Sequence, residues 1–168
     1  MRHKYLLVTL FLLLFAGCED PLNEVGNDKL VDLTGNWKFQ IGDDSTWSKI
    51  DFNDSSWDVI SVPSSWENQG FHGYNGYAWY RISFQGTSAL AGKNLALHLG
   101  YIDDVDEVWF NGVKIGTSGG FPPDYKSAYN AYRIYYLPSS LVNFTAINTI
   151  AVRVYDAQLE GGILAGDP

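Results

Sequence analysis

Four acidic side chains fall within five residues of the 168-residue chain. Asp103, Asp104, Asp106 and Glu107 are interrupted only by Val105. Like charges this close are unfavourable unless water or a cation neutralises them, and oxygen-rich clusters suit Ca²⁺. The spacing is not that of an EF-hand loop, and alternate residues of a strand point to opposite faces. Two interpretations stay open: structural Ca²⁺ held by Asp103, Asp104 and Asp106, or a solvated strand start whose carboxylates cap nearby loop amides.

Aromatic and hydrogen-bonding side chains gather in three segments rich in glycine and proline, residues 43–57, 64–77 and 117–131. Loops on a rigid scaffold often carry binding sites. Aromatic rings pack on the C–H face of a sugar while polar groups bond its hydroxyls, and a binding cleft needs both kinds of group. The competing interpretation is that these aromatic residues pack within their loops. The candidates for a carbohydrate site are Trp66, His72, Tyr74, Tyr77, Tyr125, Asn130 and Arg133.

Hydrolytic chemistry has weaker support in the sequence. Residues 116–120 match the G-x-S-x-G pattern, but a nucleophile elbow needs a helix directly after the serine, and Pro123 leaves no room for one. We interpret the segment as a glycine-rich loop. A glycosidase needs two carboxyl groups about 5–9.5 Å apart. The positions of Glu67, Glu107 and Glu160 do not indicate such a pair, so we identify no catalytic residue.

The N-terminus has the order of a secretory signal. Basic residues at positions 2–4 precede an apolar run at residues 5–15, and small residues follow. The run is shorter than the about 20 apolar residues of a membrane-spanning helix. We therefore expect a cleaved signal peptide over residues 1–17.

The residue after this signal is Cys18, the only cysteine, which excludes an intramolecular disulfide. The segment 15–18, Phe-Ala-Gly-Cys, resembles the lipobox of bacterial lipoproteins. The resemblance implies a lipid anchor on Cys18 and a place in the cell envelope, at the outer membrane or cell surface. Residues 18–32 then comprise the lipidated cysteine and a polar tether.

The mature chain is acidic. Removal of the signal leaves nine Lys and Arg against nineteen Asp and Glu, a net charge of −10. Such a surface repels phosphate backbones, so we expect no nucleic-acid partner. Its length suits one domain, residues 33–168, and a hydrophobic content of 46% indicates a real core.

Apolar and polar residues alternate in several short segments, as in strands that bury one side. These segments are 37–41, 80–84, 95–99, 105–110 and 150–154. Asn111-Gly112 accepts positive φ at both positions and predicts a two-residue hairpin. Many short antiparallel strands indicate a β-sandwich or jelly roll, with Trp37, Trp57 and Trp79 in its core.

Several motifs together resemble the N-terminal sugar-binding domain of glycoside hydrolase family 2. They are Leu-Thr-Gly-Asn-Trp-Lys-Phe at 33–39, Asp-Ser-Ser-Trp at 54–57, Val-Pro-Ser-Ser-Trp-Glu at 62–67, Trp-Tyr-Arg at 79–81, the hairpin at 105–116 and Asn-Thr-Ile-Ala-Val-Arg-Val at 148–154. The resemblance covers about residues 33–163 and implies a galactose-binding-domain-like jelly-roll β-sandwich. It also implies that catalytic glutamates lie in a separate barrel domain.

The C-terminal segment departs from that family. Gly161-Gly162-Ile163 resembles the turn that leads into the closing strand, but no match for that strand follows before Pro168. We therefore expect the closing strand to be missing and one sheet edge to be unpaired.

The resemblance implies a noncatalytic carbohydrate-binding or scaffold module whose partner is a glycan or a hydrolase, with no cofactor beyond structural Ca²⁺. Related modules occur in sialate O-acetylesterases and bacterial sensors. The alternatives are therefore an N-terminal fragment of a β-galactosidase-like glycosidase, a fragment of an acetylesterase, or a sensor or interaction ectodomain.

Overall fold

The computed structural model describes residues 29–165, so the signal sequence and Cys18 lie outside the described residues. Within that range the expected alternation appears as strands joined by short 3-10 turns. The strands are β1 (Gly35–Ile41), β2 (Asp58–Val62), β3 (Gly76–Gln85), β4 (Leu95–Asp103), β5 (Val105–Phe110), β6 (Val113–Ser118), β7 (Tyr132–Leu137), β8 (Ile147–Asp156) and β9 (Gly162–Ala165). The turns are η1 (Ser45–Ser48), η2 (Glu67–Gln69), η3 (Ser88–Leu90) and η4 (Ser139–Leu141).

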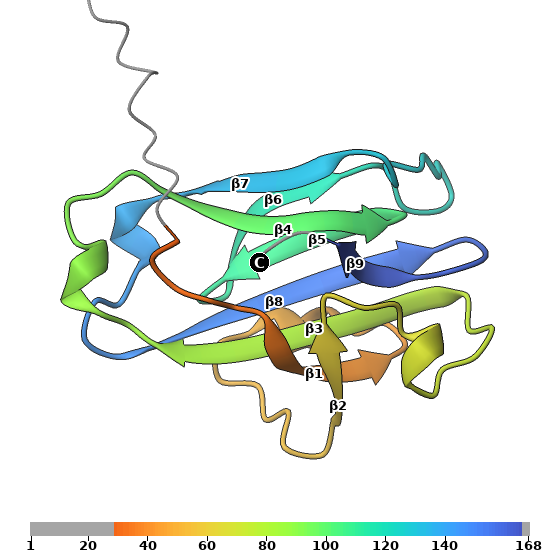
Figure 1. The fold of residues 1–168 in the computed structure, drawn as a ribbon, viewed down its shortest axis with the longest axis horizontal. Helices are drawn as coiled ribbons and strands as arrows, with labels where there is room; N and C mark the ends of the chain where they lie inside the picture. The colour runs from red at the N-terminus through yellow and green to blue at the C-terminus, as the bar shows by residue number, and fades with distance from the viewer. Residues whose placement is uncertain (1–28, 166–168) are drawn as a thin grey trace, which may run out of the picture.

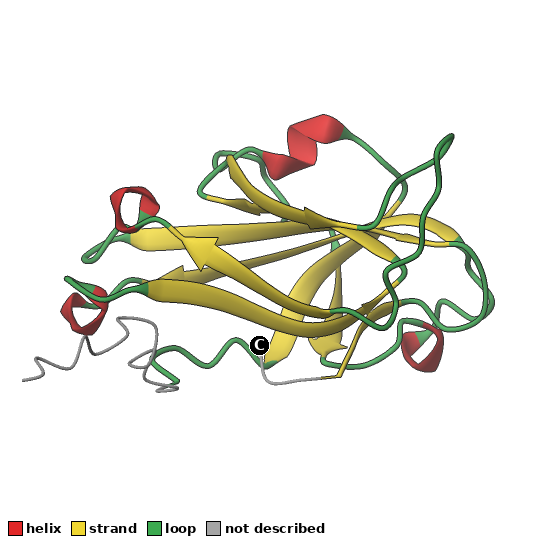
Figure 2. Ribbon diagram, turned by 90° about the horizontal axis from the view of Figure 1, so that it is seen from above, coloured by secondary structure: helices red, strands yellow, loops and turns green. Residues whose placement is uncertain are grey.

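The strands form two antiparallel sheets that pack face to face (Figures 1 and 2). The larger sheet has the order β2-β1-β3-β8-β5-β6, and the smaller has the order β7-β4-β9. The prediction of an all-β sandwich is therefore confirmed. No helix within residues 29–165 is long and apolar enough to cross a membrane.

The main core lies between the sheets. Ile150, Val152 and Val154 on β8 are fully buried, as the two-residue period requires. Trp37 and Trp66 complete this core at its sides and are also buried. Burial of such large apolar side chains supplies most of the favourable free energy of folding.

A second, smaller aromatic cluster lies on the outer face of the larger sheet. Trp57 and Trp79 are buried there because loop 43–57 folds back over the strands; Figure 2 shows its helical turn η1 above that sheet. The loop also covers Arg81, which alternation places on a polar face but which is only 2% exposed. Its guanidinium pairs with Asp54 at 2.8 Å. The prediction that Trp37, Trp57 and Trp79 are core residues is confirmed, across two separate clusters.

The hairpin prediction at Asn111-Gly112 is also confirmed. Asn111 has a φ of 50° and Gly112 a φ of 78°, between the paired strands β5 and β6. Both angles lie in the left-handed region that a tight two-residue turn requires. The Asn111 side chain donates to the Leu141 carbonyl at 2.8 Å, so the turn is attached to the loop beside it.

The expectation of a missing closing strand is wrong. The short strand β9 pairs with the end of β4, with Ile163 opposite Ile102 and Gly162 opposite Asp103. Gly162 has a φ of 117°, and a Cβ there would lie 2.5 Å from the Tyr80 hydroxyl oxygen. The sequence analysis missed this strand, of which the structure describes the four residues Gly162–Ala165.

A buried ion pair connects the two sheets. Arg133 on β7 and Asp106 on β5 are both buried, with 2.8 Å between Arg133 Nε and Asp106 Oδ1. The Tyr135 hydroxyl donates to the other oxygen of Asp106. The remaining guanidinium nitrogens donate to backbone carbonyls, including that of Asp104 at 3.0 Å and that of Ala128 at 2.6 Å. Every charge in this network therefore has a partner, as buried charges require.

We predict that Arg133→Met lowers the free energy of unfolding by about 3–5 kcal/mol, because it leaves the Asp106 carboxylate buried and uncompensated. Urea denaturation measures the loss. Lys114→Met is the matched control, since Lys114 pairs with Glu107 at the surface and its removal should cost less than about 1 kcal/mol. Equal losses in the two variants would contradict the assigned role of the buried pair.

Candidate functional site

A charged and aromatic surface lies at one end of the larger sheet, centred on Arg153 of β8. The guanidinium pairs with Asp43 at 2.5 Å and with Glu107 at 3.1 Å. The β8 register places Arg153 opposite Trp79 on one side and Glu107 on the other. Asp43 also accepts a hydrogen bond from the Trp79 indole at 3.0 Å, so the ion pair is attached to the aromatic cluster beneath it.

Aromatic rings surround this guanidinium. Its central carbon lies 4.2 Å from the ring centre of Phe121 and 4.8 Å from that of Tyr77. The two rings are nearly parallel, with centres 5.8 Å apart. Tyr155 packs against Tyr77 at 4.8 Å, and Tyr125 packs against Tyr155 at 5.7 Å. We call this set the Arg153 surface: Asp43, Tyr77, Glu107, Phe121, Tyr125, Arg153 and Tyr155.

The charged groups of the Arg153 surface stabilise one another in their ionised forms. Burial acts to raise the pKa of Asp43, but hydrogen bonds from Arg153 and Trp79 outweigh it and lower that pKa below its ordinary value. Burial acts to lower the pKa of Arg153, but the hydrogen bonds and charges of Asp43 and Glu107 outweigh it and raise that pKa above its ordinary value. A fixed guanidinium, two carboxylates and partly exposed rings offer both apolar contact and directed hydrogen bonds, which are the requirements of a small polar ligand.

The predicted carbohydrate residues do not all come together. Tyr77 and Tyr125 belong to the Arg153 surface. His72 is exposed in loop 64–77 and Asn130 is exposed in the loop after β6, and neither is part of that surface as defined above. Tyr74 is half-buried and donates its hydroxyl hydrogen to the Tyr77 carbonyl at 2.7 Å, so it positions the loop before β3.

Two further candidates are buried and offer no surface to a ligand. Trp66 has no exposed area, its ring packs against Phe39, and its indole donates to the Tyr74 carbonyl at 3.1 Å. Arg133 is 1% exposed and is the inter-sheet partner of Asp106. We therefore reassign both residues to the framework.

The sequence analysis did not select five members of the Arg153 surface as binding residues: Asp43, Glu107, Phe121, Arg153 and Tyr155. Arg153 and Tyr155 lie on the late strand β8, where alternation indicates only a solvated face. The available signal was their shared register with Tyr77 and Glu107, which depends on strand pairing that alternation alone does not specify.

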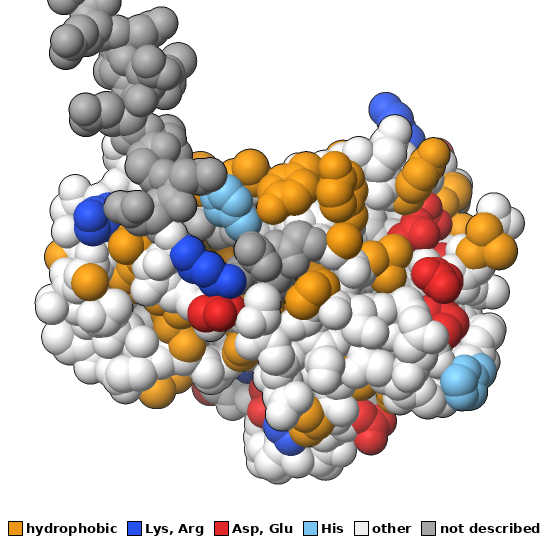
Figure 3. Space-filling model, viewed as in Figure 1, with side chains coloured by type: hydrophobic (Ala, Val, Ile, Leu, Met, Phe, Trp, Pro, Cys, Tyr) orange, Lys and Arg blue, Asp and Glu red, His pale blue; other side chains and the backbone are white. Residues whose placement is uncertain are grey.

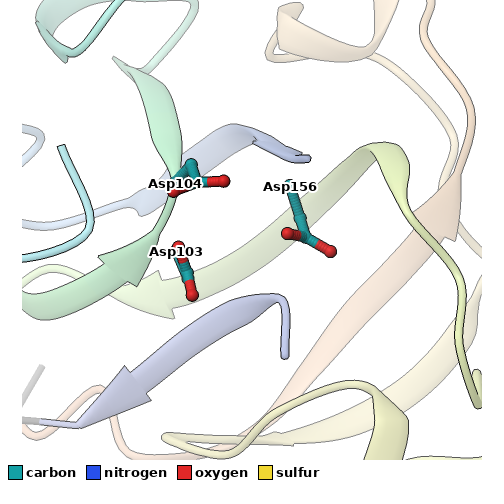
Figure 4. Close-up of side chains that lie close together, drawn as sticks. All are labelled: Asp103, Asp104 and Asp156. Carbon is teal, nitrogen blue, oxygen red and sulfur yellow. The ribbon is translucent and has the colours of Figure 1, made fainter. Parts of the chain in front are cut away.

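Three carboxylates form a second feature at the same end of the molecule. Asp103 is the last residue of β4, Asp104 follows it, and Asp156 is the last residue of β8. One oxygen of each lies within 4.8 Å of the others (Figure 4). Asp104 is held by the Ser127 hydroxyl and by the backbone N–H of Ala157 at 3.1 Å.

The electrostatics of this acidic cluster are unfavourable. Burial, a hydrogen bond to Asp104 and the charges of Asp104 and Asp156 raise the pKa of Asp103 to about 7. Burial, together with the charges of Asp104 and Glu67, raises the pKa of Asp156 to about 6. Three negative charges in a partly buried space favour either protons or a cation.

The structure changes the predicted metal ligands. Asp106 points between the sheets, where burial raises its pKa while Tyr135 and Arg133 oppose the rise, so it is not available to a cation with Asp103 and Asp104. Asp156, which the sequence analysis did not select, takes its place. Both positions follow from parity, because Asp106 shares a face with buried Val108 and Asp156 shares one with buried Val154.

The residues considered for hydrolysis have structural contacts. Ser118 ends β6, and its hydroxyl oxygen lies 2.7 Å from that of Tyr135. The segment that follows it is a loop rather than a helix. Glu67 accepts from the Gly161 N–H at 3.0 Å, and Glu107 pairs with Arg153 and Lys114.

The fold and these two features define a jelly-roll sandwich with polar and aromatic groups at its rim. No family model matches the chain. It is 29% identical to a putative β-glucuronidase of Formosa agariphila over 74% of this chain and 12% of that protein. It is 27% identical to the β-galactosidase BoGH2A of Bacteroides ovatus, over 76% of this chain and 15% of that protein.

Solved structures of such enzymes contain a domain with a similar fold. A β-glucuronidase from glycoside hydrolase family 2 matches with a TM-score of 0.62 and 21% identity, over 74% of this chain and 13% of the other. A β-glucuronidase 2 of Bacteroides uniformis, described as a calcium-binding mutant, matches with a TM-score of 0.65 and 23% identity, over 80% and 17%. In fold and in sequence, the chain is therefore similar to a small N-terminal domain of glycoside hydrolase family 2 enzymes, which makes up 12–17% of their length.

We predict a pH-dependent effect of Asp43→Asn. Because the folded-state pKa of Asp43 is lowered, its contribution to stability is present above its unfolded value of about 3.8 and is lost as the pH falls through the lower folded value. At pH 7 the variant should melt about 2–4 °C below the unmodified chain, since the pair is partly exposed and is worth about 1 kcal/mol. Differential scanning calorimetry should show this gap narrowing as the pH falls below about 3.8, the ordinary pKa of the group. Asp51→Asn, at an exposed carboxylate of the same loop, should leave the melting temperature unchanged at both pH values.

Proposed function

We propose that the chain is a noncatalytic carbohydrate-binding module of the glycoside hydrolase family 2 type, and that glycans bind at the Arg153 surface. The observation that carries this proposal is the convergence of Tyr77 and Phe121 around a fixed guanidinium, with Tyr125 packed beside them through Tyr155. Aromatic faces contact the C–H groups of a sugar ring, and the Asp43, Glu107 and Arg153 groups bond its hydroxyls.

The charge of the surface favours one class of glycan. The two relatives reported above are named as a β-glucuronidase and a β-galactosidase. Arg153 is already neutralised by Asp43 and Glu107, and the chain carries a formal net charge of −8. A glucuronate carboxylate would meet two carboxylates and one engaged cation, whereas a galactose unit carries no charge. We therefore propose neutral, galactose-type glycans as ligands.

We predict that Phe121→Ala and Tyr125→Ala each weaken binding to galactose-containing polysaccharide about tenfold, because Phe121 lies against the guanidinium and Tyr125 extends the aromatic surface through Tyr155. Isothermal titration calorimetry measures the affinity, and free galactose should compete more strongly than glucuronate. Tyr136→Ala is the matched control, since Tyr136 is a 67% exposed tyrosine on the smaller sheet. No binding to any neutral polysaccharide, or an equal loss in the control, would rule out this site.

A second candidate function is docking onto a hydrolase. The outer face of the smaller sheet exposes Tyr101, Tyr132, Ile134 and Tyr136 by 42–67%, and Figure 3 shows hydrophobic side chains gathered over this side. Contiguous exposed apolar surface marks interaction sites. The chain spans only 12% and 15% of the two relatives reported above, so we propose that the remaining domains of such an enzyme, in this polypeptide or another, cover this face.

We predict that Tyr136→Lys releases the chain from that hydrolase, because the new charge would be buried in an apolar contact. Co-expression with the hydrolase encoded nearest to this chain, followed by size-exclusion chromatography, measures the complex. Phe121 lies in the loop after β6, outside this set of residues, so Phe121→Ala should leave the complex intact. A chain that elutes alone in all three cases would exclude docking to that hydrolase.

We also propose that a lipid on Cys18 anchors the module in the cell envelope, with residues 18–32 as its tether. The support is the order of basic, apolar and small residues before this cysteine. Labelling of the chain by radioactive palmitate in cells, and its loss in Cys18→Ser, tests the anchor. An unlabelled chain would contradict it.

A further inference from the structure

The acidic cluster contains an oxygen that has no partner. Asp156 has no exposed area, and its Oδ1 accepts from the Gln158 N–H at 2.8 Å, but Oδ2 has no hydrogen-bond partner among the described residues. An unpaired polar atom that is buried costs free energy, and an unpaired charge costs more. The Asp156 carboxylate lies beside those of Asp103 and Asp104 (Figure 4).

The neighbouring protein groups do not supply the missing positive charge. The Arg133 guanidinium acts on Asp103, but its nitrogens are used by Asp106 and by three backbone carbonyls. Glu67 adds a further negative charge that acts on Asp156, and its Oε1 also has no partner within the described part of the chain. The space between β4 and β8 therefore has an excess of oxygen and of negative charge.

We propose that Asp103, Asp104 and Asp156 bind one calcium ion at the junction of β4, β5 and β8. Calcium accepts six to eight oxygen ligands at about 2.3–2.6 Å in irregular geometry. Two oxygens on opposite sides of such an ion are about 4.8 Å apart, so every pair in the cluster is within its reach. Water supplies the ligands that the three carboxylates do not.

The chemistry of the cluster favours calcium over other metals. It has only oxygen donors, whereas zinc selects histidine and cysteine. Asp104 is constrained by Ser127 and by the Ala157 backbone, and the three carboxylates come from two strand ends. Magnesium needs near-ideal octahedral geometry at shorter distances, and calcium tolerates ligands placed in this way.

The ion would connect the framework to the loop after β6. Asp104 contacts that loop through the Ser127 hydroxyl and through the Ala128 N–H, which donates to the Asp104 carbonyl at 2.9 Å. The same loop carries Phe121 and Tyr125 of the Arg153 surface. If that surface binds glycans as proposed above, calcium should tighten glycan binding by ordering these rings; the calcium site itself does not depend on the glycan proposal.

Thermal denaturation of the purified full chain, after treatment with EDTA, tests the site with calcium chloride alone. We expect a rise in melting temperature of roughly 5–10 °C at about 100 times the dissociation constant, and a smaller rise with magnesium chloride. Asp156→Asn keeps the acceptor for the Gln158 N–H but removes the charge, so it should abolish the calcium response. Asp58→Asn removes an equal charge from exposed strand β2 and should retain the full response.

A second measurement keeps the test independent of folding defects. Terbium luminescence, sensitised by nearby aromatic residues, should appear with the unmodified chain, be displaced by calcium, and be lost in Asp103→Asn, whose side chain is only partly buried. No calcium-dependent shift in the unmodified chain, or an equal shift in Asp156→Asn, would overturn the proposal. A calcium response without glycan binding would leave the ion site standing and reject only the proposed glycan function.

Discussion

The pairing of Arg133 with Asp106 is the interaction on which the rest of the structure depends. Both charges lie between the sheets, where water cannot solvate them, so each is tolerated only because the other is present. The guanidinium also holds the carbonyls of Asp104 and Ala128. One buried side chain therefore joins the two sheets, the β4–β5 corner and the loop after β6.

That loop is shared by both features at the rim. It contributes Phe121 to the Arg153 surface and Ser127 to the acidic cluster. The Arg133 guanidinium donates a hydrogen bond to the Ala128 carbonyl of the same loop. The strands supply a rigid frame, while the chemistry is on side chains at their ends and on the loops between them. This arrangement separates stability, which depends on the inter-sheet core, from ligand contact, which depends on the rim.

Several site residues could have been found from the sequence with stricter use of parity. Asp106 and Asp156 fall on the inward faces of β5 and β8 by the same alternation that places buried Val108 and Val154 there. A carboxylate that points into the core needs a compensating charge or donor. Asp106 pairs with Arg133, whereas the charged groups beside Asp156 are the carboxylates of Asp103 and Asp104. Alternation predicts that each is buried, but it cannot tell which partner each will have.

The sequence by itself determined strands β1, β3, β4, β5 and β8, the hairpin at Asn111-Gly112 and the sandwich class, because two-residue periodicity and positive φ are local properties of the chain. Only the tertiary structure decided that Trp66 and Arg133 are framework while Arg153 lies at the centre of a surface. Those assignments depend on strand order, on the fold of loop 43–57 over the larger sheet and on contacts such as Arg153 with Asp43, which lies 110 residues away in the sequence. Long-range pairing is a property of the packed molecule, and no local pattern encodes it.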